Sequence, residues 1–328
     1  MWVNNLPLAF QGGLASSDGG DAPRGGAALP PDAVACFDRD GFLVVPALCD
    51  AAEQGEIRLI LEDLFLREVG RREGSQFDML GLDRGARDAL QPQIINPSIY
   101  APLLRQTRYF QTIKAIASQI LGAGAAFSFD HSILKPAGRV AATPWHQDEA
   151  HRQDVHFHCD QVSFWMPLQD VSELNGCMRY VPGSNRGALL PHRSLGNDPR
   201  IHALECLPEH FDEAAASVQP VPAGWCILHA GRTLHSALPN RSGVDRLVYI
   251  ISFRGLPRAR SAPQHLPWLM EKNTSASKRH QRWRMQGGFM VLALRRLHRA
   301  LRSDIRTLPL RLWRALRRFL SSLPGARP

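Results

Sequence analysis

The sequence predicts a mainly β fold with flanking helices, because helical patterns come first and strand patterns dominate from residue 126 to residue 256. Helices followed by a long series of strands suit a jelly roll that is buttressed by N-terminal helices. A chain of 328 residues is long enough for one large β domain with extensions. We expect a flexible segment over residues 1–33, the jelly-roll domain over 34–257 and a basic helical tail over 258–328.

The predicted helices lie before most of the strands. Residues 12–31 are rich in Gly, Ala, Ser, Asp and Pro, which predicts a flexible segment, and a short strand is expected over Phe42–Pro46. Residues 50–69 then have apolar side chains at helical spacing. Residues 101–121 carry isoleucines at the same spacing, which predicts a second helix with one buried face.

The later segments have the composition of strands. Val162–Leu168 alternates between apolar and polar residues and predicts a half-buried strand. Turn residues precede two shorter strands, one over Cys177–Val181 and one that starts near Ile227. The strongest β run is Arg246–Phe253, which follows the polar loop Pro239–Gly243. This loop and the segments on either side of it predict a hairpin.

A histidine and a carboxylate two residues apart form the most informative motif, His146-Gln147-Asp148. Side chains at positions i and i+2 of an extended segment point to the same face, so His146 and Asp148 could bind one metal ion. His235, far downstream, could supply a third ligand. Two neutral imidazoles and one carboxylate that leave other coordination positions open are typical of non-haem iron oxygenases. A chain with 13 His and 30 acidic residues can contain a His-x-Asp pattern by chance. The assignment of a metal site therefore depends also on the motifs around the tripeptide.

Arg246 has a predicted place beside these residues. If the hairpin is centred between Asn240 and Arg241, His235 lies opposite Arg246, and opposed residues share one face of a sheet. A slip of one residue would turn Arg246 to the other face. The planar guanidinium group binds a carboxylate through two hydrogen bonds. A dicarboxylate such as 2-oxoglutarate could therefore chelate iron through its keto-acid end and place its far carboxylate on Arg246.

The ordered set of motifs resembles the phytanoyl-CoA dioxygenase family of Fe(II)- and 2-oxoglutarate-dependent oxygenases over residues 34–256. The resemblance is carried by Gly41–Pro46, Lys135-Pro136, Trp145–Asp148, Trp165–Leu168, Asn175–Cys177, Val181–Ser184, His235 and Arg246. It implies a double-stranded β-helix, a cupin-like jelly roll, in which His146, Asp148 and His235 bind Fe(II) and Arg246 binds the far carboxylate of 2-oxoglutarate.

The same resemblance implies Lys135 and Trp165 as residues of the cosubstrate pocket. For Lys135 the equal alternative is an exposed lysine before a turn, and for Trp165 it is an aromatic residue of the core.

The resemblance also implies a reaction type. Enzymes of this class use O2 and 2-oxoglutarate as cosubstrates and release succinate and CO2, and the protein supplies positioning. In related iron halogenases a small residue replaces the carboxylate ligand. Because Asp148 is present, hydroxylation of an aliphatic C–H bond is favoured over halogenation, while desaturation and ring chemistry stay open. The sequence does not identify the small-molecule or lipid-like substrate.

Other histidines near the motif have two interpretations. His151, His156 and His158 could line a substrate pocket or compete as metal ligands, but loops collect polar residues, which favours a polar loop. His131 could face the pocket or solvent. Four further histidines have no informative spacing, namely His192, His202, His210 and His229.

The basic charge of the chain lies in its C-terminal tail. Residues 258–328 hold 17 Lys and Arg and two acidic residues, whereas residues 1–257 hold 22 basic and 28 acidic residues. Apolar stripes over 290–301 and 312–323 are flanked by arginines, as in basic amphipathic helices. Contact with an anionic membrane and packing on the acidic domain or on a second subunit are equal alternatives. Specific nucleic-acid binding is not expected, because no recognition motif accompanies the charge.

Cysteine usage and the N-terminus predict a cytoplasmic protein, with peripheral membrane contact through the tail as an option. The six cysteines are scattered without a C-x-x-C motif, so neither a zinc site nor a disulfide framework is indicated. The first residues lack the pattern of a signal peptide. Two function classes remain, a dioxygenase that acts on a small molecule and a non-catalytic jelly-roll protein that its tail recruits to membrane or nucleic acid.

Overall fold

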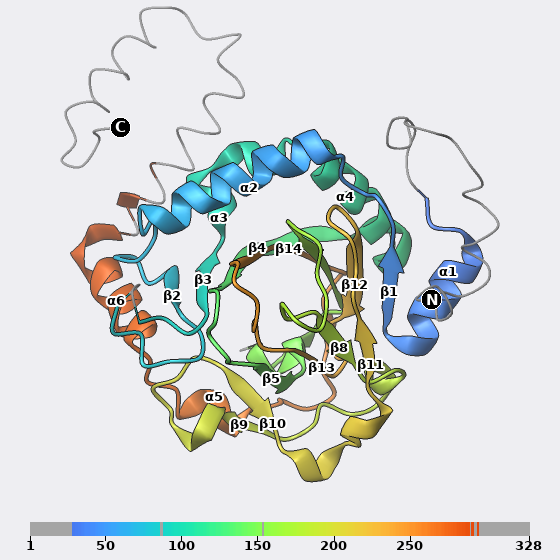
Figure 1. Cartoon of the computed structure of the whole chain (residues 1–328). Helices are drawn as coiled ribbons and strands as arrows, with labels where there is room; N and C mark the ends of the chain where they lie inside the picture. The colour runs from blue at the N-terminus through green and yellow to red at the C-terminus, as the bar shows by residue number, and fades with distance from the viewer. Residues whose placement is uncertain (1–27, 86–87, 153, 289, 292–293, 295–328) are drawn as a thin grey trace, which may run out of the picture. The chain divides into compact units, whose positions relative to one another are not determined.

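The structure is a computed structural model that describes residues 28–85, 88–152, 154–288, 290–291 and 294 (Figure 1). The predicted flexible segment before residue 28 lies outside the described residues, and so do most of the two amphipathic stripes of the tail. The chain divides into two compact units, residues 1–279 and 280–328. The two sheets and the candidate site belong to the first unit.

Two antiparallel sheets form the jelly roll, which confirms the predicted mainly β fold with flanking helices. The larger sheet contains β1 (Phe42–Val45), β2 (Gln76–Asp78), β3 (Pro92–Ile95), β4 (Ala126–Lys135), β7 (Gln161–Pro167), β12 (Cys226–Ala230) and β14 (Arg246–Arg254). The smaller sheet contains β5 (Thr143–His146), β8 (Met178–Tyr180), β11 (Ser217–Gln219) and β13 (His235–Ala237). The strand orders are β1-β12-β7-β14-β4-β3-β2 and β11-β8-β13-β5.

Shorter strand pairs and α-helices accompany the two sheets. Two-stranded pairs are formed by β9 (His192–Ser194) with β10 (Leu204–Cys206) and by β6 (Phe157–His158) with β15 (Arg258–Ala259). The α-helices are α1 (Pro31–Asp40), α2 (Ala51–Leu66), α3 (Pro97–Tyr100), α4 (Arg108–Leu121), α5 (Pro267–Met270) and α6 (Ser275–Trp283). In Figure 1, α2 and α4 run along the outside of the strands.

Capping residues set where the two long helices begin. The side chain of Asp50 accepts a hydrogen bond from the Glu53 backbone N–H at 2.8 Å, and Thr107 accepts one from Phe110 at 3.1 Å. Each such cap contributes about 1 kcal/mol. The predicted helices over 50–69 and 101–121 are confirmed as α2 and α4. α4 is shorter than predicted, because Thr107 caps its N-terminus and a separate 3-10 helix, Pro102–Arg105, precedes it.

One hydrophobic core fills the space between the larger sheet and these helices. It includes Ile57 from α2, Ile113 from α4 and Phe164 from β7, all fully buried. The opposite face of β7 is buried as well, where Trp165 packs with Tyr180 of the smaller sheet. The prediction of a half-buried strand over residues 162–168 is therefore wrong, because helices cover one face of β7 and a second sheet covers the other.

The predicted hairpin between His235 and Arg246 does not form. β13 pairs with β5 and β8, so His235 lies opposite His146 and Tyr180. β14 pairs with β4 and β7, so Arg246 lies opposite Lys135. The predicted pairing is wrong because the two strands belong to facing sheets, whose partners come from distant parts of the sequence. His235 and Arg246 nevertheless line the same cavity between the sheets.

The chain after β14 is hydrogen-bonded to the β domain. Trp268 Nε1 donates to a backbone carbonyl of residue 150 at 2.9 Å, and Lys272 Nζ donates to the carbonyls of residues 201–203 at 2.7 to 3.0 Å. This first part of the predicted tail, residues 258–279, thus packs on the domain. Among the residues that the structure describes, no helix is both long and apolar enough to cross a membrane.

Candidate active site

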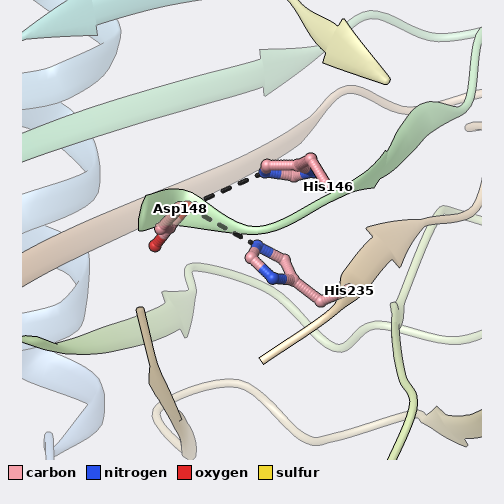
Figure 2. Close-up of side chains that lie close together, drawn as sticks. All are labelled: His146, Asp148 and His235. Carbon is pink, nitrogen blue, oxygen red and sulfur yellow. Dashed lines mark ion pairs between the residues drawn. The ribbon is translucent and has the colours of Figure 1, made fainter. Parts of the chain in front are cut away.

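Three side chains of the smaller sheet and the turn that follows it converge on one point (Figure 2). His146 ends β5, Asp148 begins the 3-10 turn η3 (Asp148–His151) and His235 begins β13. Their ligand atoms lie within 4.8 Å of one another, and Asp148 Oδ1 is 3.7 Å from Nε2 of each histidine. Gln147 is extended, with φ −114° and ψ 130°, so its neighbours share a face as predicted. The donor set suits a divalent transition metal.

In each histidine, a hydrogen bond at Nδ1 fixes the ring so that Nε2 faces this point. Nδ1 of His146 lies 2.9 Å from the Pro144 carbonyl oxygen, and Nδ1 of His235 lies 2.8 Å from that of Thr233. A carbonyl oxygen can only accept, so each Nδ1 carries the proton and each Nε2 presents its lone pair. Burial lowers the pKa of both imidazoles, which keeps them in the neutral form that binds a metal.

One carboxylate oxygen of Asp148 is hydrogen-bonded to other side chains of the protein. Its Oδ2 accepts hydrogen bonds from Ser163 Oγ at 3.1 Å and from His229 Nε2 at 3.3 Å. Burial alone would raise the pKa of Asp148, but the bond from His229 and the nearby imidazoles outweigh burial and hold this pKa well below its ordinary value. The ionised carboxylate therefore presents Oδ1 to the two histidines while Oδ2 is held in place.

His229 and Tyr180 extend this network, and the sequence analysis missed both. The Tyr180 hydroxyl lies 3.2 Å from His229 Nδ1, and both residues are buried. Because His229 Nε2 donates to the carboxylate, its Nδ1 is the acceptor and the Tyr180 hydroxyl donates. In the sheet, His229 of β12 lies opposite Ser163 of β7, which brings both donors to Asp148. No sequence spacing reports this pairing.

Arg246 is 2% exposed and lines the cavity that also contains His146, Asp148 and His235, the three candidate metal ligands. Its Nε and NH1 have no hydrogen-bond partner among the described residues. Burial lowers the pKa of Arg246 to about 9, which still leaves it charged at neutral pH. The guanidinium carbon lies 5.7 Å from the ring centre of Trp165, which also lines the cavity. A buried cation with unused donors is costly unless an anion binds to it, so this end of the cavity fits a carboxylate.

Lys135 is buried and its ammonium group is fully used by the protein. Nζ donates to the carbonyl oxygens of Ala141, Ala237 and Leu238 at 3.2, 3.3 and 2.8 Å. An ammonium group has three N–H donors, so the backbone takes all of them. At 1% exposure Lys135 is not the exposed lysine of our alternative interpretation. Its contacts instead tie β4 to the segment that leaves β13.

The cavity has a volume of about 240 Å³ and further histidines on its wall. His131 of β4, His151 of η3 and His202 all line it. His131 thus faces the pocket rather than solvent. His151 and His156 are both exposed, as the polar-loop interpretation predicts, but His151 also lines the cavity. His158 lines a separate polar cavity.

The chain is similar to proteins of known activity. The phytanoyl-CoA dioxygenase family matches residues 37–248. A probable alpha-ketoglutarate-dependent hypophosphite dioxygenase of Stutzerimonas stutzeri is 28% identical over 215 residues, which cover 65% of this chain and 74% of that protein. L-proline trans-4-hydroxylase of Streptomyces griseoviridis is 26% identical over 264 residues, which cover 74% of this chain and 93% of the relative.

A solved structure shares the fold and holds the cosubstrate. EvdO2 from Micromonospora carbonacea var. aurantiaca, in complex with 2-oxoglutarate, has a TM-score of 0.63 and 29% identity, and the match covers 74% of this chain and 97% of EvdO2. These similarities support an Fe(II)- and 2-oxoglutarate-dependent dioxygenase rather than a non-catalytic jelly-roll protein. The cavity fits that cofactor and cosubstrate, because it offers two imidazoles and a carboxylate for iron and an unpaired guanidinium for an anion.

Proposed function

The chain belongs to the phytanoyl-CoA dioxygenase family of Fe(II)- and 2-oxoglutarate-dependent oxygenases, and from this premise we propose that His146, Asp148 and His235 bind the iron. Arg246 binds the far carboxylate of 2-oxoglutarate, and Trp165 forms the wall beside it. The observation that carries this proposal is a buried guanidinium with two unpaired donors in the same cavity as the three metal-binding side chains.

When bound, Fe(II) with 2-oxoglutarate and O2 supplies the oxidising chemistry, and succinate and CO2 are released. The chain contributes positioning. Pro144 and Thr233 carbonyls hold the two imidazoles in the tautomer that presents Nε2. Ser163 and His229 occupy Asp148 Oδ2, which leaves Oδ1 as a single ligand atom. His146, Asp148 and His235 would hold Fe(II) through three ligand atoms, a donor set typical of iron oxygenases.

The reaction outcome that we propose is hydroxylation of an aliphatic C–H bond of a small molecule. Asp148 supports this over halogenation, because its carboxylate occupies the place that a halide would need. Ile95, Phe129 and Ile133 line the cavity and offer apolar contacts to the carbon skeleton of a substrate. The relatives named for proline and hypophosphite oxidation act on small molecules as well.

The test of this assignment is an anaerobic titration of wild-type protein with Fe(II) and then 2-oxoglutarate. We expect a visible charge-transfer absorption band when the keto acid chelates the iron, and we expect it to be lost in His146→Ala. A folded, iron-loaded wild-type protein without this band would overturn the assignment. Exposed His210→Ala, which is matched in chemistry, should leave the band unchanged.

We also propose that the tail beyond residue 279 contacts anionic membrane surfaces. The support is its sequence, in which arginines flank two apolar stripes. Sedimentation of the full-length protein with vesicles of phosphatidylserine and phosphatidylcholine tests this, with pure phosphatidylcholine as the control. We expect binding to the anionic vesicles that weakens as salt rises. Equal sedimentation with both vesicles would refute membrane contact.

A further inference from the structure

Asp148 and His235, two of the proposed iron ligands, are joined by contacts of their sequence neighbours. β5 ends at His146, so Asp148 lies beyond the strand ladder that pairs β5 with β13. The residues before and after Asp148 both bind the loop 231–234, which connects β12 to β13 and ends next to His235. These contacts therefore determine where Asp148 lies relative to the two histidines.

Glu149 binds this loop through its backbone and through its side chain. Its N–H donates to the Gly231 carbonyl oxygen at 2.8 Å. Its two carboxylate oxygens each accept a hydrogen bond from Arg232 at 2.9 Å, one from Nε and one from NH2. Because both groups are planar, this pair of bonds fixes direction as well as distance. A shift of the turn η3 relative to the loop would break both bonds.

Gln147 provides a second attachment to the same loop. It is fully buried, and its Nε2 donates to the Arg232 carbonyl oxygen at 2.7 Å while its Oε1 accepts from the Leu190 backbone N–H at 2.8 Å. Arg232 is thus bound at its backbone by the residue before Asp148 and at its side chain by the residue after it.

In the described part of the chain, Arg232 is the nearest of the basic side chains at ion-pair distance from the Glu149 carboxylate. His158 Nδ1 lies 3.3 Å and Arg260 NH2 lies 3.8 Å from Glu149 Oε1, and both come from the region of β6 and β15, which holds no proposed iron ligand. Burial raises the pKa of Glu149, but the hydrogen bonds and charge of Arg232, with the charges of His158 and Arg152, outweigh burial and lower this pKa. The carboxylate therefore stays ionised and bound to Arg232.

We propose that Arg232 is a positioning residue for iron binding. Its ion pair with Glu149 sets the place of Asp148 relative to the two histidine ligands. This inference rests on the proposed function. The hydrogen bonds to Asp148 Oδ2 orient the carboxylate, whereas Arg232 places the turn that carries it. Because the two histidines are held by the pairing of β5 with β13, loss of Arg232 should weaken the metal site without abolishing it.

Ni(II) affinity in a double-mutant cycle tests this inference. Ni(II) binds imidazole and carboxylate donors more tightly than Fe(II) does, so weakened sites stay measurable by titration calorimetry. We expect Arg232→Gln to weaken Ni(II) binding about 10- to 100-fold, the range for residues that support metal ligands. In Asp148→Ala the same change should cost less than about twofold, because no carboxylate is left to position. A general loss of stability would instead weaken both proteins equally.

Two further variants sharpen the test. Arg232 is 31% exposed, so its substitution leaves no large cavity, and Arg232→Lys keeps the charge without the pair of bonds. Its loss of affinity should lie between that of the wild type and that of Arg232→Gln. His158→Gln removes another contact of the same carboxylate and should change the affinity by less than about twofold. Melting temperatures show that each variant is folded.

An equal cost of Arg232→Gln with and without Asp148 would overturn the inference, and so would no cost in the wild-type background. A loss in His158→Gln as large as that in Arg232→Gln would overturn it as well. Failure of the proposed function gives a different result, namely that the wild-type protein binds no Ni(II) or that Asp148→Ala leaves its affinity unchanged.

Discussion

The end of the cavity where we propose that iron binds, called the metal-binding end, differs from the walls around it in how its polar atoms are hydrogen-bonded. Around His146, Asp148 and His235, each atom that does not face the common point is hydrogen-bonded to the protein. On the walls, Arg246 and Gln93 keep buried donors or acceptors without partners. The first region is organised before anything binds, whereas the second is complete only with ligands. Metal affinity and ligand affinity should therefore respond to different substitutions.

The largest effect is expected from the metal-binding residues themselves. His235→Ala removes one of three ligands, so we expect iron binding to weaken by more than about 100-fold, since loss of outer partners alone costs about 10–100-fold. Turnover should be lost with it. Iron content after anaerobic loading measures the effect, and exposed His156→Ala is the matched control. Normal iron loading of His235→Ala would show that the metal lies elsewhere.

Arg246 should separate cosubstrate binding from metal binding. Arg246→Leu removes a charged partner of the carboxylate, so the KM for 2-oxoglutarate should rise about 10- to 100-fold while iron affinity stays within about twofold. Arg254→Gln, at the exposed end of the same strand, should change neither quantity. An unchanged KM in Arg246→Leu would contradict the comparison of the two regions.

His229 should act through the metal-binding end although it is not a ligand. His229→Leu removes one of two donors to Asp148 Oδ2, so we expect Fe(II) affinity to fall about 10- to 100-fold. Tyr180→Phe, which removes only the next hydroxyl, should cost about fivefold, in line with one neutral hydrogen bond. The KM for 2-oxoglutarate at saturating iron should not move. A larger effect of Tyr180→Phe than of His229→Leu would contradict this order.

The smallest effect is a dependence of stability on pH through His192, which supports the metal-binding turn. Its Nδ1 donates to the Leu190 carbonyl and its Nε2 accepts from the Gln147 backbone N–H, so only the neutral ring satisfies both contacts. Burial lowers the pKa of His192 from 6.5 to about 4. Below pH 6.5 this histidine is protonated in the unfolded chain but stays neutral in the folded chain until about pH 4. The free energy of unfolding therefore falls between pH 6.5 and 4, by about 2 kcal/mol at pH 5.

Urea unfolding at pH 7 and pH 5 measures this loss. Wild-type protein should lose more stability between the two values than His192→Gln, which cannot take up the proton. Equal losses in the two proteins would show that His192 does not contribute to the pH dependence.

Local patterns predicted that His146 and Asp148 lie together, because their geometry is local. An extended tripeptide places His146 and Asp148 on one face whatever the rest of the fold does. The long helices were predicted for the same reason, since apolar spacing and capping residues act within a few turns. The pocket position of Trp165 came from the family resemblance, not from periodicity, which gave only its strand.

Contacts between sheets could not be predicted in this way. Arg246 was placed beside His235 by a hairpin that does not exist, and it reaches the same cavity from the facing sheet. No role was predicted for His229, because its partner Ser163 lies on a strand that is not adjacent in sequence. Lys135 matched a motif, but its three carbonyl partners come from β13 and from segments outside its own strand, whose positions depend on the whole fold.

The most direct test is an anaerobic crystal structure of the Fe(II) and 2-oxoglutarate complex, with the iron located by anomalous scattering. We predict iron bound by Nε2 of His146 and His235 and by one oxygen, Oδ1, of Asp148. We predict the far carboxylate of 2-oxoglutarate on the two donors of Arg246 that now lack partners. Iron held by other side chains, or a cosubstrate carboxylate away from Arg246, would contradict the account.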